Sequence, residues 1–428
     1  MPSEAVVLYN ARLIDGTGGQ PVADAGVVVD GPAVAWAGEL AALPESYASA
    51  RRVDVGGRTI CPGFIDTHVH FALPGKSRSI LANLSYSPSY RVLDTLERLR
   101  ITLHNGVTTA RDLMGLDAGF RQAVAERKIA GPRLLVSIAM LSQHAGHADF
   151  TVAGGIDAYA MGVAQPGAPS NLVDSVDQMR LRVRELIAAG ADCIKLASSG
   201  GITSPHDQPD WLGLRPDMIA AAVQEAQAYG GRPVAVHAIG RPGIEAAVHA
   251  GVASIEHGYA LDDQLRKEMV HRGQFLVPTL LETTADVESA GPAARAKSIH
   301  WHKVAQESFA RSVEAGVAVA MGTDSGLTMD HGNNLKELGL MVRIGGMSPM
   351  DAIVAATSNA ARLCGVDDRV GTVTAGKAAD LVLTDVDPLA DIDALGDPSH
   401  IHAVVKDGRV AIDRAQVFAA DALPALTA

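Results

Sequence analysis

The 428-residue chain has only three cysteines and no long apolar run. Cys61, Cys193 and Cys364 lie far apart and form no Cys-x-x-Cys pair, which excludes a disulfide-stapled scaffold and a zinc site built from thiolates. No stretch approaches the roughly 20 consecutive apolar residues that a transmembrane helix needs. The first residues carry no basic segment followed by an apolar run, so we expect no signal peptide and a cytoplasmic location.

Positive charge is also in deficit, because 36 Lys and Arg against 48 Asp and Glu give a formal net charge of −12. Proteins that bind nucleic acid or anionic membranes need a basic face. We therefore expect no nucleic-acid partner and no membrane partner, and a small-molecule substrate instead. Aromatic residues make up only 4% of the chain, whereas the apolar content of 47% is enough for a barrel-sized domain and a smaller one.

From residue 59 to about residue 330, apolar runs of strand length alternate with segments of helical periodicity. A doubly wound sheet would place a glycine-rich dinucleotide turn after an early strand, and this sequence has none. Eight strands with helices between them are instead typical of a (β/α)8 TIM barrel, an α/β fold. The expected strands are Thr59–His70, Val107–Leu113, Arg133–Ile138, Cys193–Ser198, Pro233–Ala238, Ala253–His257, Gln274–Leu280 and Val317–Gly322.

The two ends of the chain share a different pattern, with short alternating apolar stretches separated by Gly, Pro and Asp. Residues 1–58 and 367–428 are each too short to bury a core alone. We therefore expect them to pair into one small composite β-sandwich domain. The barrel domain then spans residues 59–366, and its last expected helices are Asn334–Ile344 and Met350–Leu363.

Histidines and an aspartate stand where the expected strands end, which is the edge where barrel active sites are built. His68 and His70 share one face of the first strand because strand side chains alternate. Two imidazoles there could bind a divalent metal, although such a pair alone is more often two ordinary strand-end histidines. His237, His257 and Asp324 follow the fifth, sixth and eighth expected strands.

Lys195 lies inside the otherwise apolar fourth strand. Burial disfavours the ammonium form, so this side chain needs a partner or must lose its charge. A neutral amine there would be nucleophilic enough to form a Schiff base or, with CO₂, a carbamate. Cys193, two residues earlier on the same face, is interpreted as part of the packing of the barrel interior.

These strand ends resemble the amidohydrolase superfamily, in particular its imidazolonepropionase-like and prolidase-like branch of metal-dependent hydrolases, which includes Xaa-Pro dipeptidases. The resemblance covers nearly the whole chain and includes six ligand types in order along the strands. The motifs that carry it are Pro62-Gly63-Phe64-Ile65-Asp66-Thr67-His68-Val69-His70, Gly106-Val107-Thr108-Thr109, Ile194-Lys195, Val236-His237-Ala238, Ile255-Glu256-His257-Gly258, Gly322-Thr323-Asp324 and the segment from Gly371 to Leu381.

The resemblance implies a site for two divalent metal ions, which in this family are usually zinc. Lys195, carboxylated on its side-chain nitrogen (N6-carboxylysine), would bridge the two ions. A hydroxide bridging the metals would attack the scissile carbonyl, while Asp324 acts as general base and then as general acid. The implied ligands are His68, His70 and Asp324 for one ion and His237 and His257 for the other.

Substrate-contacting residues are expected in the loops beyond the strands. The segment 146–149 resembles the family's GGHGD loop, so His147 would contact the substrate carboxylate or the tetrahedral oxyanion, and His144 is the rival candidate. Several dipeptide-cleaving relatives carry a tyrosine or histidine two residues after the fifth-strand histidine, where this chain has Ile239. Arg241 is close enough in sequence to substitute for that residue.

Several of the scarce aromatic residues also fall at or just beyond the expected strand ends. Among them, Tyr259 and Trp301 are the two that we expect at the substrate site. Large rigid apolar groups there favour a hydrophobic or aromatic substrate over a strongly charged one. The full set is Phe71, Tyr86, Tyr90, Phe150, Tyr159, Trp211, Tyr259 and Trp301.

The expected function is therefore that of a binuclear metal-dependent hydrolase. It would cleave the amide or peptide C–N bond of a small, hydrophobic N-acyl amino acid or dipeptide such as Xaa-Pro. The alternatives are a xenobiotic amide, carbamate or urea, including ochratoxin-like amides, and a cyclic amide such as an imidazolone. A scaffold protein that keeps the barrel without the chemistry characteristically loses ligands, and all six are present here. Relatives are frequently homo-oligomers, so we expect a homo-oligomer.

Overall fold

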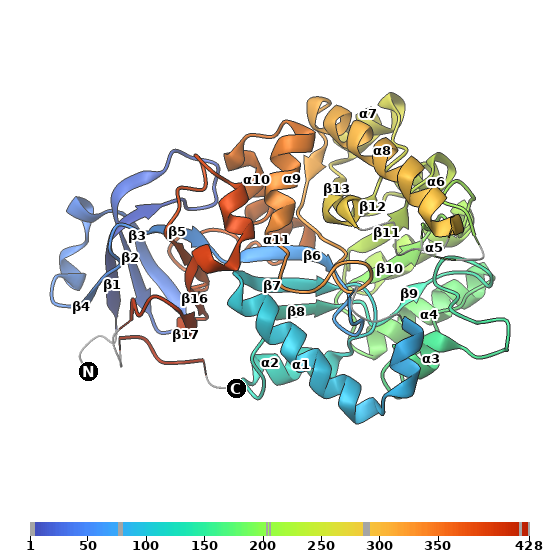
Figure 1. Cartoon of the computed structure of the whole chain (residues 1–428), viewed down its shortest axis with the longest axis horizontal. Helices are drawn as coiled ribbons and strands as arrows, with labels where there is room; N and C mark the ends of the chain where they lie inside the picture. Colours follow the sequence, from blue (N-terminus) through green and yellow to red (C-terminus); the bar gives the residue numbers. More distant parts are fainter. Residues whose placement is uncertain are drawn as a thin grey trace.

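The computed structural model describes residues 5–75, 80–202, 204, 207–285, 292–418 and 422–426. Within these residues the chain forms a barrel of parallel strands surrounded by helices (Figure 1). A separate sheet, built from both ends of the chain, lies at one end of the long axis of the molecule (Figure 1). The expected α/β TIM-barrel fold with an additional β domain is confirmed.

The barrel wall consists of parallel strands in two hydrogen-bonded groups, ordered β6-β7-β8 and β14-β13-β12-β11-β10-β9. Backbone hydrogen bonds join the groups at both ends, from Thr67 N–H to Met321 O (2.9 Å) and from Asp192 N–H to Val136 O (2.8 Å). The strands are β6 (Phe64–Val69), β7 (Val107–Asp112), β8 (Arg133–Val136), β9 (Met140–Leu141), β10 (Ile194–Ala197), β11 (Val234–Ala238), β12 (Ser254–His257), β13 (Phe275–Val277) and β14 (Ala318–Val319).

The third expected strand is interrupted in the structure. β8 ends at Val136, and Ile138 has a positive φ of 70° before the short β9 begins. β9 then pairs in parallel with β10 through Met140 and Lys195. Alternation of apolar residues does not reveal such a turn, because a β-branched residue in the left-handed region is held there by its surroundings rather than by its own preference.

Helices cover the outside of the barrel (Figure 1). Many begin at a Ser or Asp whose side chain accepts a backbone N–H of the first turn, as at Ser87, Asp117, Ser175 and Asp262. The helices are α1 (Pro88–His104), α2 (Ala118–Ala125), α3 (Ala158–Gly162), α4 (Val176–Ala188), α5 (Pro216–Ala228), α6 (Arg241–Ala250), α7 (Asp263–Arg272), α8 (Pro292–Glu314), α9 (Lys336–Gly345), α10 (Pro349–Ala355) and α11 (Ser358–Cys364).

The single helix expected over Met350–Leu363 is two helices, α10 and α11. They are separated at Thr357, whose backbone is not helical (φ −133°, ψ −93°). The Thr357 hydroxyl donates to the Ile353 carbonyl (2.6 Å), a local bond of the kind that competes with regular helix geometry. The short helices α2 and α3 were not expected from the sequence, because they span too few residues to show a helical period.

The sheet at the chain ends has eight strands in one hydrogen-bonded network. The expected strand Thr59–His70 is divided at Gly63, so that its first part, β5, pairs with β1 and β15 in this sheet. A Cβ at Gly63 would lie 2.0 Å from Thr108 Oγ1, so only glycine fits where the chain passes into the barrel. The strands are β1 (Val6–Leu13), β2 (Val22–Asp30), β3 (Ala33–Glu39), β4 (Arg51–Asp54), β5 (Thr59–Pro62), β15 (Leu381–Thr384), β16 (Ile401–Lys406) and β17 (Arg409–Asp413).

Ionic contacts join the terminal sheet to the barrel. Arg133 of β8 pairs with Asp380 (2.6 Å) and with Asp407 (2.5 Å), and the Arg133 and Asp380 side chains are almost buried. These contacts therefore hold the C-terminal part of the terminal sheet against the barrel strand that carries Arg133. None of the described helices is both long enough and apolar enough to cross a membrane.

Candidate active site

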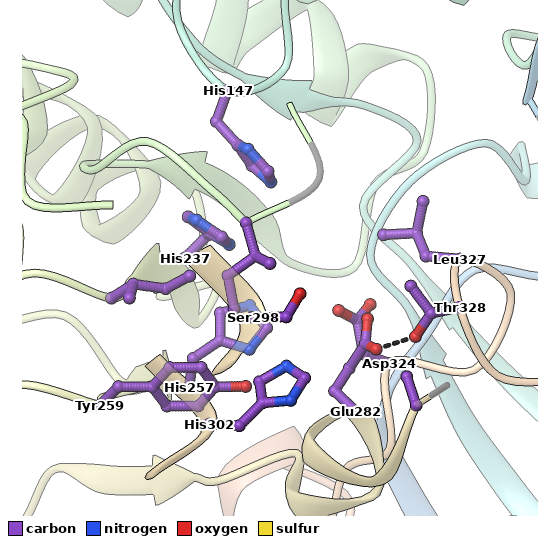
Figure 2. Close-up of a pocket in the computed structure, with 13 residues that line it drawn as sticks. His147, His237, His257, Tyr259, Glu282, Ser298, His302, Asp324, Leu327 and Thr328 are labelled. Carbon is purple, nitrogen blue, oxygen red and sulfur yellow. Dashed lines mark hydrogen bonds between the residues drawn. The ribbon is translucent and has the colours of Figure 1, made fainter. Parts of the chain in front are cut away.

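The C-terminal ends of the barrel strands surround a cavity. Figure 2 shows His147, His237 and His257 on one side of it and Asp324 with Glu282 on another. Apolar side chains such as Ile239 complete the lining, and the described lining residues include no lysine or arginine. The cavity therefore combines several imidazole and carboxyl groups with apolar walls.

His68, His70 and Asp324 meet beneath the cavity. Asp324 Oδ1 lies 3.4 Å from His68 Nε2 and 3.0 Å from His70 Nε2, and all three residues are at most 5% exposed. The two imidazoles come from the end of β6 and the carboxylate from the segment after β14, which the barrel closure brings together. The structure thus places the expected ligands of the first ion around one point.

His237 and His257 end β11 and β12 on the neighbouring part of the rim. Their ring centroids are 4.6 Å apart, and the His257 ring lies 5.2 Å from that of His68. His257 Nδ1 is 2.7 Å from Thr279 Oγ1, and His237 Nε2 is 3.1 Å from the Gly200 carbonyl oxygen. The residues expected to hold the second ion are therefore next to those expected to hold the first.

Three of the non-glycine residues with a positive φ lie at the same point. His257 has a φ of 70°, Asp324 a φ of 57° and Thr279 a φ of 49°, although none of them is glycine. Such left-handed conformations cost free energy and persist only where the surrounding structure enforces them. Their clustering around one set of converging side chains indicates a functional site rather than a structural turn.

Lys195 lies between the two groups of histidines. It is 1% exposed, and its Nζ is 3.4 Å from His68 Nε2. Burial lowers the pKa of Lys195 to about 8, although the nearby carboxylates of Glu256 and Asp324 act in the opposite direction. A substantial fraction of this amine is therefore neutral near pH 8, as carbamate formation requires.

The histidine rings are held neutral by burial. Desolvation lowers the pKa of His68 and of His237 well below the usual range, and it lowers that of His257 to about 4. Burial opposes ionisation of Asp324, but the neighbouring imidazoles of His68 and His70 outweigh it and hold the pKa of that carboxyl below its ordinary value. At pH 7 His68, His237 and His257 thus offer neutral imidazoles and Asp324 a carboxylate, the forms that bind a metal.

The donor set fits one or more divalent cations. Among the described residues, one donor atom from each of His68, His257 and Asp324 lies within 4.8 Å of the others. Asp324 Oδ1 and His70 Nδ1 are buried without a hydrogen-bond partner among the described residues, which is costly unless something else satisfies them. Imidazole and carboxylate ligands suit zinc, manganese or cobalt rather than magnesium or calcium.

The structure places His147 in the cavity and His144 outside it. The His147 ring stacks on that of His237 with centroids 3.9 Å apart (Figure 2). Its Nδ1 is 3.4 Å from Ser204 Oγ. His144 is exposed and pairs with Asp174 at 2.5 Å, so that it faces solvent. Of the two rival histidines, only His147 can reach a substrate bound in this cavity.

Tyr259 lines the cavity, but Arg241 and Trp301 do not. Arg241, at the start of α6, is half-exposed and paired with Asp262 (2.7 Å) and Glu245 (2.8 Å). Trp301 packs instead against the apolar cluster that Ile239, Tyr259 and Ala305 form. The prediction placed Arg241 near the site only because it lies close to His237 in the sequence. In the structure, the acidic residues on α6 and before α7 hold its guanidinium on the outer surface.

The remaining aromatic residues of the expected set are not among those lining the cavity. Phe71 is buried and stacks on His331 (5.1 Å between centroids), while Tyr86 stacks on Tyr90 (4.8 Å). Tyr159 is buried and donates to the Ile138 carbonyl (3.3 Å). Most of these rings therefore anchor loops to the barrel, and the preference for a hydrophobic substrate depends on Tyr259 and the apolar walls.

The site residues expected from the sequence did not include Glu282, Ser298, His302 and Thr328, which also line the cavity. Glu282 belongs to the short 3-10 helix η4 (Leu280–Thr284), and Thr328 donates a hydrogen bond to its carboxyl group (Figure 2). Burial raises the pKa of Glu282 well above the usual range, and the nearby charge of Asp324 raises it further. No periodic sequence pattern identifies these positions. Glu282 lies on the short helix η4, and Thr328 lies in the segment after β14. Ser298 and His302 lie on one face of α8.

Comparison with known proteins defines the class. The chain matches the model of the amidohydrolase family over residues 59–411, and it belongs to that family. It is 30% identical over 423 residues to the ochratoxinase of Aspergillus niger, which covers 95% of this chain and 87% of that protein. It is also 28% identical over 403 residues to the imidazolonepropionase of Mycolicibacterium smegmatis, covering 90% of this chain and 87% of the relative.

Solved structures agree with this assignment. A prolidase in complex with N-methylphosphonate-L-proline superimposes with a TM-score of 0.85 at 31% identity, covering 96% of this chain and 100% of the other. The expected resemblance to the amidohydrolase superfamily is confirmed. The protein is therefore an enzyme that hydrolyses carbon–nitrogen bonds, and it acts on amides.

Proposed function

We propose that this protein is a binuclear, zinc-dependent hydrolase of small hydrophobic N-acyl amino acids or dipeptides. The observation that carries the proposal is the convergence of six nitrogen and oxygen donors at the strand ends beneath one cavity. The proposed ligands are His68, His70 and Asp324 for one ion, His237 and His257 for the other, and carboxylated Lys195 between them. When bound, the metals would polarise the scissile carbonyl and supply an activated water.

Asp324 is the proposed proton carrier. Its carboxylate borders the cavity and stays ionised beside the imidazoles of His68 and His70. It can take a proton from the attacking water and deliver it to the leaving nitrogen, which makes it general base and then general acid. His147, on the opposite wall, is the proposed hydrogen-bond donor to the developing oxyanion.

The cavity lining indicates the class of substrate. Ile202, Ile239 and Leu327 offer apolar surface, and Tyr259 adds an aromatic face. None of the described lining residues is an arginine or lysine that could pair with a free carboxylate. An N-acyl or aminoacyl group with an apolar side chain therefore fits this cavity, while a carboxylate can be recognised by imidazole and hydroxyl donors.

A substrate screen tests the proposal. The zinc-loaded protein is assayed against Xaa-Pro and other dipeptides and against N-acetyl and N-benzoyl derivatives of apolar and charged amino acids. We expect cleavage of apolar members with higher kcat/KM than of their Asp, Glu, Lys and Arg counterparts, because the walls are apolar. Cleavage of no member would contradict the proposed substrate class.

A second substrate class is favoured by Ile239 and by the same lack of cationic groups in the described lining. A cavity that does not depend on pairing with a carboxylate could also take a xenobiotic amide, carbamate or urea, an ochratoxin-like amide, or a cyclic amide such as an imidazolone. The screen separates the two classes when neutral aryl amides and phenylureas are included. Faster cleavage of these than of any N-acyl amino acid would favour the second class.

A further inference from the structure

The barrel interior contains an ion pair directly beneath the proposed metal site. Arg111 of β7 and Glu256 of β12 are both 0% exposed, and Arg111 Nη2 donates to Glu256 Oε1 at 3.0 Å. Arg111 Nε also donates to the Thr67 carbonyl at 2.6 Å. The pair thus connects the β6-β7-β8 group with the other group of barrel strands, across an interior that branched apolar residues usually fill.

The second oxygen of Glu256 faces a proposed metal ligand. Glu256 Oε2 lies 2.8 Å from His68 Nδ1. The two atoms face each other within hydrogen-bonding distance but are not aligned as a hydrogen bond, and neither has another hydrogen-bond partner among the described residues. The other ring nitrogen, His68 Nε2, faces Asp324 and Lys195 at 3.4 Å. Glu256 therefore acts on the side of the ring opposite to the donor cluster.

The chemistry of these groups fixes the direction of every hydrogen bond. A guanidinium only donates and an ionised carboxylate only accepts. Arg111 therefore holds Glu256 with its free oxygen toward His68, and an acceptor at Nδ1 favours the imidazole tautomer that carries its proton there. The lone pair of Nε2 is then left free on the side of Asp324 and Lys195, as metal binding requires.

Stability alone does not explain the pair. Buried ion pairs commonly contribute no more to folding than apolar residues of the same volume, and Arg111 Nη1 has no hydrogen-bond partner among the described residues. Ser254 adds a hydroxyl that donates to Glu256 Oε1, so three polar groups occupy a layer where apolar side chains would pack. Such an arrangement is expected where orientation of a functional group matters more than packing.

We propose that Arg111 and Glu256 are positioning residues that set the tautomer and orientation of His68 for the metal ion it shares with His70 and Asp324. This inference rests on the proposed function. It predicts an effect mainly on the ion that His68 holds, because the Glu256 carboxylate faces His68, whereas the described contact of Glu256 with His237 is the backbone pairing of β12 with β11.

Glu256→Gln is the main test variant. Because Arg111 only donates, it holds the amide oxygen toward itself and turns the amide NH₂ toward His68 Nδ1. That donor favours the wrong tautomer, with the proton on Nε2. Zinc titration against a chromophoric chelator in bicarbonate buffer is expected to give one site of wild-type affinity and one site weakened by about 10–100-fold.

Arg111→Met in the Glu256→Gln background provides a rescue test. Without the guanidinium the amide can flip and present its oxygen to His68, so the double variant is expected to bind the weakened ion more tightly than Glu256→Gln alone. If the pair had only a structural role, the double variant would bind this ion more weakly than Glu256→Gln, because the loss of the second partner would destabilise the barrel interior further. The d–d absorption bands of the cobalt-substituted proteins provide a second readout, because they report ligand geometry without turnover.

Arg266→Lys is the matched control. Arg266 is also buried (2% exposed) and hydrogen-bonded to Ser308 and Ser312, but it lies on α7 outside the barrel. This variant is expected to keep both zinc affinities even if its unfolding temperature falls. Wild-type affinity at both sites of Glu256→Gln, or equal weakening of both, would overturn the positioning role. A wild-type protein that binds no zinc would overturn the proposed function, and this inference with it.

Discussion

At the scale of single residues, the proposed chemistry depends on side chains whose ordinary charge is suppressed by burial. Lys195 and His257 both have lowered pKa values, because the barrel interior disfavours their cationic forms. Burial opposes ionisation of Asp324, but the imidazoles of His68 and His70 hold the pKa of that carboxyl below its ordinary value. In solvent, the same lysine, histidine and aspartate side chains would have ordinary pKa values. Their surroundings in the barrel therefore supply the reactivity.

Lys195→Ala is expected to reduce kcat/KM for the best substrate by about 100-fold or more, because the bridging carboxylate disappears. Acetate or propionate added to the variant should restore part of the activity by occupying the vacated space. Steady-state kinetics of the zinc-loaded variant, with and without the acid, measure both effects. Wild-type activity in Lys195→Ala would contradict its bridging role.

Activation of the metal-free protein is expected to depend on pH through Lys195. Its pKa is lowered from 10.5 to about 8, so the ammonium dominates below pH 8 and the nucleophilic amine dominates above it. At a fixed concentration of dissolved CO₂, the rate of activation by zinc should therefore rise between pH 6.5 and about 8 and level off above. A rate that is flat or falling across this interval would show that amine deprotonation does not limit carbamate formation.

At the scale of secondary-structure elements, the strand ends could be predicted and the loop-borne residues could not. His68, His70 and Lys195 lie on strands, where the period of two shows which side chains share a face. Glu282 lies on η4, whose conformation depends on packing against distant residues. His147 was predicted only through its resemblance to a family loop.

The position of η4 depends on one buried carboxyl group of α9. Glu337 is 0% exposed, and its two oxygens accept the backbone N–H groups of Leu280 and Leu281, both at 2.7 Å. Glu337→Ala would leave both groups buried without an acceptor, so we expect a loss of about 2–4 kcal/mol in the free energy of unfolding. Urea denaturation measures this loss.

Glu337→Gln is the matched control for that experiment. Its amide oxygen can still accept one of the two N–H groups, so its loss of stability should be smaller than that of Glu337→Ala. The alanine variant should also show a raised KM, since η4 carries Glu282 into the cavity wall. An alanine variant within about 0.5 kcal/mol of wild type would contradict this account of η4.

At the scale of the whole molecule, the alternation of strands and helices was sufficient to predict a barrel with a terminal β domain. The point where the chain passes from the terminal sheet into the barrel could not be predicted. The division lies at Gly63, and only the packing of Thr108 against this residue shows why glycine is required there. The end of the third strand before Ile138 could not be predicted either, because the positive φ of this residue is imposed by its surroundings. Oligomeric state remains a prediction.

The junction of the two parts is expected to contribute strongly to stability. Arg133→Ala would leave Asp380 almost buried without its partner, so we expect the free energy of unfolding to fall by about 3–5 kcal/mol. Arg100→Ala provides the comparison, since Arg100 and Glu97 are about half-exposed and such a pair contributes less than about 1 kcal/mol. Equal, small losses in urea denaturation would show that the ionic junction does not hold the terminal sheet.

The central claim is that six side chains from five barrel strands and the segments directly after them bind two metal ions around a carboxylated lysine. Anomalous X-ray diffraction at the zinc edge, on crystals of the zinc-loaded protein grown in bicarbonate, tests it most directly. The account predicts two peaks about 3.5–4 Å apart, one beside His68, His70 and Asp324 and one beside His237 and His257, with density for a carboxylate on Lys195 between them. A single peak, or zinc bound elsewhere with an unmodified Lys195, would contradict it.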